Sequence, residues 1–349
     1  MRKLIALCGM VSASIPAVSP AQPETGAEQA IDSYQMPRPA EVALPRYPAA
    51  AARDGKEGWV ELNFMVSPDG EAYEFQVLDR AGDEAFVRAA QQAAEETSFS
   101  PARMGDRAVD GNLTIVYRFV LEGALRTASP AFAARYRRFA RALNEGSQDE
   151  AVADLARLEE EDIRNNYESA YLSLARYQFA TRYGSPLEQM RHLDTALGEN
   201  VDQPEFESFL PEDIVTPSRR SLFQLLVQNQ HFAEAVDVFR LMEIRGDEEG
   251  LNLFRETHDR LQAFRMTDEP YAVERQLDQN GFWILGLFKD DFYLDQVTGT
   301  VDQIKLRCER EYVFLAFDPE TQYTVSDSAG DCLLEVLGAP GTTFTLVQQ

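Results

Sequence analysis

The stretch that decides the fold is VELNFMVSPDGEAYEFQV, residues 60–77. Apolar side chains occupy every second position from Val60 to Val66, which is the pattern of a half-buried β-strand. The next four residues are Ser-Pro-Asp-Gly, in which proline presets φ and glycine accepts a positive φ, so a turn is expected. The alternation resumes from Tyr73 to Val77. This stretch therefore predicts a β-hairpin.

The residues on either side of the hairpin predict two helices and a third strand. A short helix can begin near Tyr47 and end at Gly55, since glycine commonly ends helices. After the hairpin, Asp83 can cap a helix with an apolar stripe over residues 86–93. The last strand is expected between Leu113 and Val120. The order helix, strand, strand, helix, strand predicts a small α+β domain over residues 45–122.

The first residues predict export. A basic start, Met-Arg-Lys, precedes an apolar stretch that is too short to span a bilayer, and small residues stand at positions 19 and 21. We therefore expect a signal peptide at 1–21, cleaved after Ala21, and an exported mature protein. Residues 22–44 contain three prolines and show no periodicity, which predicts a linker.

Two further zones follow the small domain. Residues 129–267 are rich in Ala, Leu, Arg and Glu, and three helix–turn–helix patterns in them resemble degenerate tetratricopeptide-like repeats. Residues 280–349 contain short apolar runs between Asp, Gly and Pro turns, which predicts a small all-β domain. The expected fold class is α+β multidomain: a small α+β domain, an α-hairpin array and a small β domain.

Two cysteines remain after removal of the signal peptide. Cys308 and Cys332 each lie in an alternating apolar run, so both side chains can point inward from neighbouring strands. In an oxidising compartment such a pair is expected to form a disulfide, which would stabilise the fold by about 3.5 kcal/mol in the chain-entropy model. The alternative is two separate buried thiols.

Composition excludes several classes of function. The chain of 349 residues has 58 acidic and 33 basic side chains, giving a net charge of −25, which argues against nucleic acid and anionic membranes as partners. Its three histidines lie far apart, and it has no phosphate-binding loop or nucleophile elbow. We predict no catalytic residue, no metal site and no cofactor, and therefore a protein that is not an enzyme.

One segment resembles a known family. The residues that carry the resemblance include prolines, glycines, aromatic residues and one aspartate at ordered positions between 45 and 120. They include Pro45, Tyr47, Pro48, Gly55, Gly58, Asp69, Gly70, Phe99 and Pro101. As an ordered set they resemble the C-terminal domain of TonB proteins, and the element order predicted above agrees with the fold of that family.

The resemblance implies an energy-transducer module in the periplasm that binds an extended segment of an outer-membrane transporter. In that family the partner pairs with the last strand of the sheet, a recognition mode called strand addition. The corresponding residues are Leu113, Thr114, Ile115, Val116, Tyr117, Arg118 and Phe119. Cleavage of the signal peptide would leave a motor complex as an indirect partner only.

Two classes of function remain open. The first is a TonB-like component of transmembrane transport that binds a transporter by strand addition. The second is a periplasmic adaptor in which the helical array binds another periplasmic protein, while the TonB-like domain is a scaffold or a homodimer interface.

Overall fold

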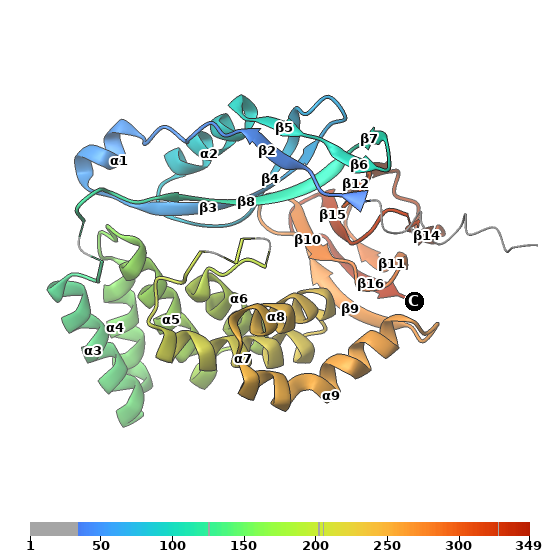
Figure 1. Ribbon diagram of the computed structural model, residues 1–349. Helices are drawn as coiled ribbons and strands as arrows, with labels where there is room; N and C mark the ends of the chain where they lie inside the picture. Colours follow the sequence, from blue (N-terminus) through green and yellow to red (C-terminus); the bar gives the residue numbers. More distant parts are fainter. Residues whose placement is uncertain (1–33, 125, 202, 205, 327) are drawn as a thin grey trace, which may run out of the picture.

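The computed structural model describes residues 34–349 except 125, 202, 205 and 327. The predicted signal peptide, its cleavage site and the first part of the predicted linker lie outside the described residues. Figure 1 shows three parts: a sheet with two helices, a row of helices below it, and a group of strands at one end of that row. We call them the N-terminal module (residues 34–122), the helical region (130–265) and the C-terminal module (271–349).

The N-terminal module contains the predicted helix, strand, strand, helix and strand in that order, together with five short strands that were not predicted. Its bounds are β1 (Tyr34–Gln35), β2 (Arg38–Glu41), α1 (Ala49–Asp54), β3 (Gly58–Val66), β4 (Ala72–Ala81), α2 (Glu84–Glu96), β5 (Ser98–Ser100), β6 (Ala102–Met104), β7 (Arg107–Val109) and β8 (Gly111–Phe119). Strands β4, β3 and β8 form an antiparallel sheet in that order. Asp83 caps α2 by accepting a hydrogen bond from the Ala85 amide at 2.8 Å.

One face of this sheet forms the core of the module with α2. The alternating residues of β3 that the sequence singles out are buried against Phe86 and Ala90 of α2. The hairpin turn closes through the Gly70 amide, which donates to the Ser67 carbonyl at 2.9 Å. Alternation in the sequence therefore places the core correctly, because a period of two puts every second side chain on one face.

Residues 34–41 differ from the predicted linker. They form β1 and β2, which pair with β6 and β5 of the same module. Both strands are short and lie at edges, where a proline such as Pro39 is tolerated because its missing amide leaves no gap in a ladder. Composition alone did not reveal these strands because their partners, residues 98–104, lie about sixty to seventy residues later in the chain.

The helical region contains seven helices within the described residues. They are α3 (Pro130–Glu145), α4 (Gln148–Glu159), α5 (Asn166–Tyr183), α6 (Pro186–Leu197), α7 (Glu212–Gln228), α8 (Phe232–Arg245) and α9 (Glu248–Arg265). Short connections join α3 to α4, α5 to α6 and α7 to α8, at the three turns that the sequence predicts. The connection between α6 and α7 is longer and contains no described helix or strand.

The C-terminal module consists of two antiparallel four-stranded sheets. Its strands are β9 (Tyr271–Gln276), β10 (Phe282–Gly286), β11 (Asp291–Thr298), β12 (Val301–Cys308), β13 (Tyr312–Leu315), β14 (Tyr323–Thr324), β15 (Cys332–Gly338) and β16 (Thr343–Gln348). One sheet has the order β10-β15-β12-β13 and the other β14-β11-β16-β9. Strand β9 precedes the predicted start at residue 280, so the β structure begins earlier than the apolar runs indicate.

The hydrophobic core continues from the helical region into the C-terminal module. One cluster of buried residues runs from Ala170 to Leu346, and the rings of Phe232 in α8 and Phe288 lie 5.3 Å apart. The N-terminal module joins the helices through the buried carboxylate of Glu57, which accepts the amides of Leu121 at 2.9 Å and Asn166 at 3.3 Å. The predicted separate domains are therefore packed against one another.

No helix in the described part of the chain is both long and apolar enough to cross a membrane.

Candidate functional site

Strand β8 lies at one edge of the sheet in the N-terminal module. It pairs with β3 from Gly111 to Phe119 without a register shift, and no strand pairs with its outer side in the part of the chain that the structure describes. Leu113, Ile115, Tyr117 and Phe119 face the core beneath α2. The other predicted binding residues of the strand, Thr114, Val116 and Arg118, face the opposite side of the sheet.

The outward backbone groups of β8 belong to the even-numbered residues. The Val116 amide donates to Oε1 of Gln203, and the Asn112 amide donates to the Glu309 carbonyl at 3.3 Å, so both point away from β3. Alternation along an antiparallel strand turns the amides of Thr114 and Arg118 the same way. Within the described residues neither of these two amides donates to another segment. Two of the four outward amides from Asn112 to Arg118 thus have no acceptor in another described segment.

The connection between α6 and α7 covers the outer side of β8 near Val116. The Arg118 guanidinium lies over the rings of Phe206 and Phe209, at 4.6 and 4.8 Å from their centroids. It also donates to the Glu207 carbonyl at 2.7 Å and to the Gly198 carbonyl at 3.4 Å. These contacts fix the only charged side chain of the strand to the helical region.

A small apolar cluster lies under this connection. Trp59, Ala81 and Val116 are buried there, and Phe206 and Phe209 pack against them. The sheet is therefore covered on both faces: by α2 on one side, and by the helical region and the C-terminal module on the other.

Burial shifts the pKa of two side chains of β8. Burial is the main cause of the lowered pKa of the Arg118 guanidinium, and the nearby positive charge of Arg245 lowers that pKa further. Burial also raises the pKa of the Tyr117 hydroxyl to about 12, so that this side chain is neutral at pH 7.

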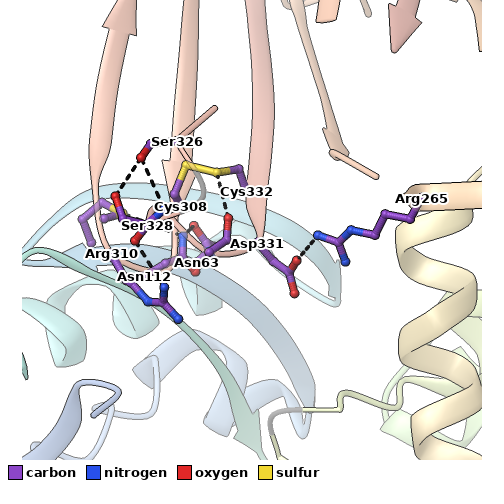
Figure 2. The surroundings of a disulfide bond; sticks show 11 residues. Asn63, Asn112, Arg265, Cys308, Arg310, Ser326, Ser328, Asp331 and Cys332 are labelled. Carbon is purple, nitrogen blue, oxygen red and sulfur yellow. Dashed lines mark hydrogen bonds and ion pairs between the residues drawn. A yellow bond between two sulfur atoms is a disulfide. The ribbon is translucent and has the colours of Figure 1, made fainter. Parts of the chain in front are cut away.

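The first residues of β8 contact the C-terminal module. Asn63 of β3, fully buried, donates to Oδ1 of Asn112 at 2.8 Å and to Oγ1 of Thr114 at 3.0 Å. The Glu309 carbonyl, which accepts the Asn112 amide, also accepts the Tyr34 hydroxyl at 2.5 Å. Figure 2 shows Asn63 and Asn112 beside the disulfide that joins Cys308 and Cys332. The two cysteines lie directly opposite each other on β12 and β15, as the sequence predicts.

The residues that carry the family resemblance support the fold of the N-terminal module. The Tyr47 ring packs at 5.8 Å from both Phe86 and Phe119, and its hydroxyl donates to the Lys56 carbonyl at 2.6 Å. A Cβ atom on Gly58 would lie 2.5 Å from the Ala81 carbonyl oxygen, and one on Gly70, where φ is +82°, would lie 2.2 Å from the Phe99 carbonyl oxygen. Both sites accept only glycine without movement of the backbone.

The other family positions are also structural. Pro48 precedes α1, and Gly55 ends it with a φ of +66°. Phe99 is buried with its ring 5.4 Å from Phe64. Pro45 and Pro101 are half-buried, and Asp69 is exposed in the hairpin turn. None of these described side chains lies on the outer edge of β8.

A charged cluster that sequence reasoning missed joins β4 to the C-terminal module. Glu74 has a φ of +53° at a β-bulge, and its carboxylate lies 3.0 Å from the Lys305 ammonium and accepts the Tyr312 hydroxyl at 2.8 Å. Arg307 donates to the Glu74 carbonyl and to the buried carboxylate of Glu335. Burial raises the pKa of Glu74, but the hydrogen bonds from Lys305 and Tyr312 outweigh it and leave that pKa lowered. No local motif marks these residues, because they come from four strands: β4, β12, β13 and β15.

Within the described residues, no group of three or more His, Cys, Asp or Glu side chains is arranged to hold a metal ion. This observation does not test the prediction that the protein has no catalytic residue, which rests on the sequence alone.

Comparison with known proteins matches residues 43–121 to the family described as Gram-negative bacterial TonB protein C-terminal. Protein tonB2 of Pseudomonas aeruginosa is 43% identical over 77 residues, which are 22% of this chain and 28% of that protein. Protein TonB of Vibrio cholerae is 34% identical over 113 residues, which are 31% of this chain and 46% of that protein. The predicted resemblance over residues 45–120 is therefore confirmed, while this chain spans less than half of either relative.

Two solved structures are also similar. The solution NMR structure of the Pseudomonas aeruginosa TonB CTD has 29% identity and a TM-score of 0.24, and covers 26% of this chain and 90% of that one. The TonB2 protein from Vibrio anguillarum has 22% identity and a TM-score of 0.20, and covers 31% of this chain and 100% of that one. The matched family segment ends at residue 121, so the tetratricopeptide-like character of the helical region stays a prediction.

Proposed function

We propose that this protein binds an extended segment of an outer-membrane transporter by strand addition at the outer edge of β8, in support of transmembrane transport. The observation that carries the proposal is that the last strand of the TonB-like segment is an edge strand. Its Thr114 and Arg118 amides point outward with no partner in another described segment.

The chemistry of the edge suits such a partner. An added strand would pair its backbone with the outward groups of β8, and each such hydrogen bond contributes about 0.5–1.5 kcal/mol net. The strand contains no proline, so every amide can donate. Side chains of the partner would lie near Thr114 and Val116 on one face of the sheet and near the aromatic core residues on the other. These contacts would make the edge select among partner sequences.

The first prediction tests the edge directly. Thr114→Pro and Val116→Pro each remove one outward donor. Thr114→Pro should weaken the binding of an extended peptide from an outer-membrane transporter by about tenfold, because its amide has no partner in another described segment, whereas Val116→Pro should have a smaller effect, because its amide donates to Gln203 in the free protein. Thr114→Ala is the matched control, because it removes the hydroxyl that Asn63 contacts but keeps the amide. Fluorescence anisotropy measures the affinity and circular dichroism verifies the fold. Unchanged affinity in both folded proline variants would rule the proposal out.

We further propose that the protein acts in the periplasm after cleavage of residues 1–21. The second prediction is that the mature chain begins at Gln22, because small residues at positions 19 and 21 suit signal peptidase. Mass spectrometry of the exported protein decides this point. An intact Met1 in the membrane fraction would contradict it and would favour direct coupling to a motor complex.

A second candidate function is a periplasmic adaptor. It is favoured by the internal partners of Val116 and Asn112, which make the TonB-like segment an integral part of the larger fold. In that case the helical region binds another protein, and the N-terminal module is a scaffold or a homodimer interface. A crosslinking pull-down from intact cells separates the two functions: an outer-membrane transporter supports the first, and a soluble periplasmic protein supports the second.

A further inference from the structure

The outer edge of β8 is closed in the middle by the chain itself. The Val116 amide, which lies at the centre of the predicted binding residues, donates to the side chain of Gln203. A few residues later, Phe206 and Phe209 hold Arg118 between their rings and the strand. A partner strand that pairs along the whole of β8 needs the space and the donors that these side chains now occupy.

The contacts that close the edge are of a kind that a partner strand can replace. Gln203 offers one side-chain oxygen, whereas an added strand offers a row of backbone carbonyls. The described residues of this connection form neither helix nor strand, so moving them breaks no regular hydrogen-bond ladder. The apolar contacts beneath Phe206 belong to a small cluster that includes Trp59 and Val116 and is distinct from the core under α2. Two further contacts must also yield: the Phe209 ring packs at the edge of the main core, 5.5 Å from the Tyr167 ring, and Arg245 donates to the Phe206 carbonyl at 2.8 Å.

We propose that Gln203 and residues 206–209, which we call the edge latch, are an autoinhibitory contact that a partner strand must displace from β8. The inference rests on the proposed function, since it concerns the regulation of the same site. The resting protein then binds its partner only through the fraction of molecules in which the latch is open. The measured affinity is reduced by that fraction, and any event that holds the latch open raises it.

Arg118 has a defined part in this device. In the closed state its guanidinium donates to the carbonyls of Glu207 and Gly198. When the latch leaves, this side chain, the only charged one in β8, is exposed at the edge of a strongly acidic protein. We therefore expect the open edge to prefer partner strands with an acidic side chain opposite Arg118.

The third prediction tests closure without any ligand. The variant Gln203→Ala/Phe206→Ala removes the acceptor and one ring of the latch, and should speed hydrogen exchange of the Val116 amide in the full-length protein by about tenfold. Gln203→Glu keeps an acceptor oxygen at the same place and should exchange as slowly as the parent. Gln148→Ala, at an exposed position of α4, is the matched control for loss of a glutamine side chain.

The same variants test competition with a partner. The double variant should bind the transporter peptide about tenfold more tightly than the parent, whereas Gln203→Glu and Gln148→Ala should bind like the parent. If the Val116 amide exchanges at the same rate in the parent and in the double variant, the proposed latch is wrong, whatever the affinity for the peptide. Faster exchange with unchanged affinity of a peptide that the parent binds would overturn it as an autoinhibitory contact. If no variant binds the peptide, including the double variant with its fast exchange, it is the proposed function that fails.

Discussion

Replacing Glu335 by leucine should lower the free energy of unfolding by about 3 kcal/mol, because it removes the buried carboxylate to which the Arg307 guanidinium donates and leaves it only the Glu74 carboxylate, at 3.7 Å. Both side chains are only 2% exposed, and they form an ion pair between neighbouring strands of the C-terminal module. A buried charge that loses its partner keeps its full desolvation cost, which is why breaking such a pair costs more than the pair itself contributes.

The double variant Arg307→Met/Glu335→Leu is the control that separates charge from packing. It replaces both ions by apolar side chains, so most of the lost stability should return, as expected when neither charge remains buried. Urea unfolding followed by circular dichroism measures both variants and the parent. A Glu335→Leu variant that loses less than about 1 kcal/mol, or a double variant no better than the single one, would contradict this account.

The consequence of this pair extends to the N-terminal module. Arg307 also donates to the Glu74 carbonyl at the bulge of β4, and Lys305 and Tyr312 bind the Glu74 carboxylate. The cluster thus holds the C-terminal module against the sheet whose far edge is β8. We expect a variant that weakens this cluster to loosen the contact between β4 and the C-terminal module more than the packing of the core beneath α2.

Much of the fold was accessible from local pattern. The alternation of residues 60–77, the turn at Gly70 and the cap at Asp83 each act over a few residues, and the structure contains the hairpin and helix that they predict. The three helical hairpins were found in the same way, because a short polar turn between two apolar stripes is a local signal. The ladder of β8 follows the predicted strand from Leu113 to Phe119.

What the sequence could not reveal depends on contacts between distant residues. The strands β1 and β2 exist because β6 and β5 accept them as partners, and nothing in residues 34–41 signals this. Strand β11 was not predicted because Asp290, Asp291 and Asp295 surround its buried residues Phe292 and Leu294, and an acidic run of this kind is typical of a solvated turn.

The cover over β8 was equally inaccessible to sequence reasoning. Gln203 and Phe206 lie about ninety residues after Val116, in a connection without periodicity. Their side chains become informative only when the fold brings them to the edge. A prediction from sequence could identify the binding strand by family resemblance, but it could not say which of its donors are already bound.

Removing the disulfide should be the second large perturbation, and it should reach the edge of β8. The variant Cys308→Ser/Cys332→Ser opens a loop with a sequence separation of 24 residues. The chain-entropy model predicts a loss of about 3.5 kcal/mol from such a change. Reduction of the parent by dithiothreitol should cause the same loss, while the reductant should leave the double variant unchanged. This comparison is the control for the substituted side chains.

Hydrogen exchange near the disulfide shows whether it positions the turn after Cys308 or only stabilises the whole fold. Cys308 adjoins Glu309, whose carbonyl accepts the Asn112 amide at the start of β8, and the Glu309 amide donates to the Asp331 carbonyl beside Cys332 at 3.0 Å. Once the bond is cut, this turn is held by hydrogen bonds alone, so exchange of the Asn112 amide should accelerate more than that of amides inside β3. Equal acceleration of exchange at Asn112 and inside β3 would show that the disulfide does not position the turn. Free labelling of Cys308 and Cys332 in the protein purified from its own compartment would show that the disulfide does not form there. If Asn112 alone responds, the C-terminal module controls one end of the edge and the connection between α6 and α7 controls its centre.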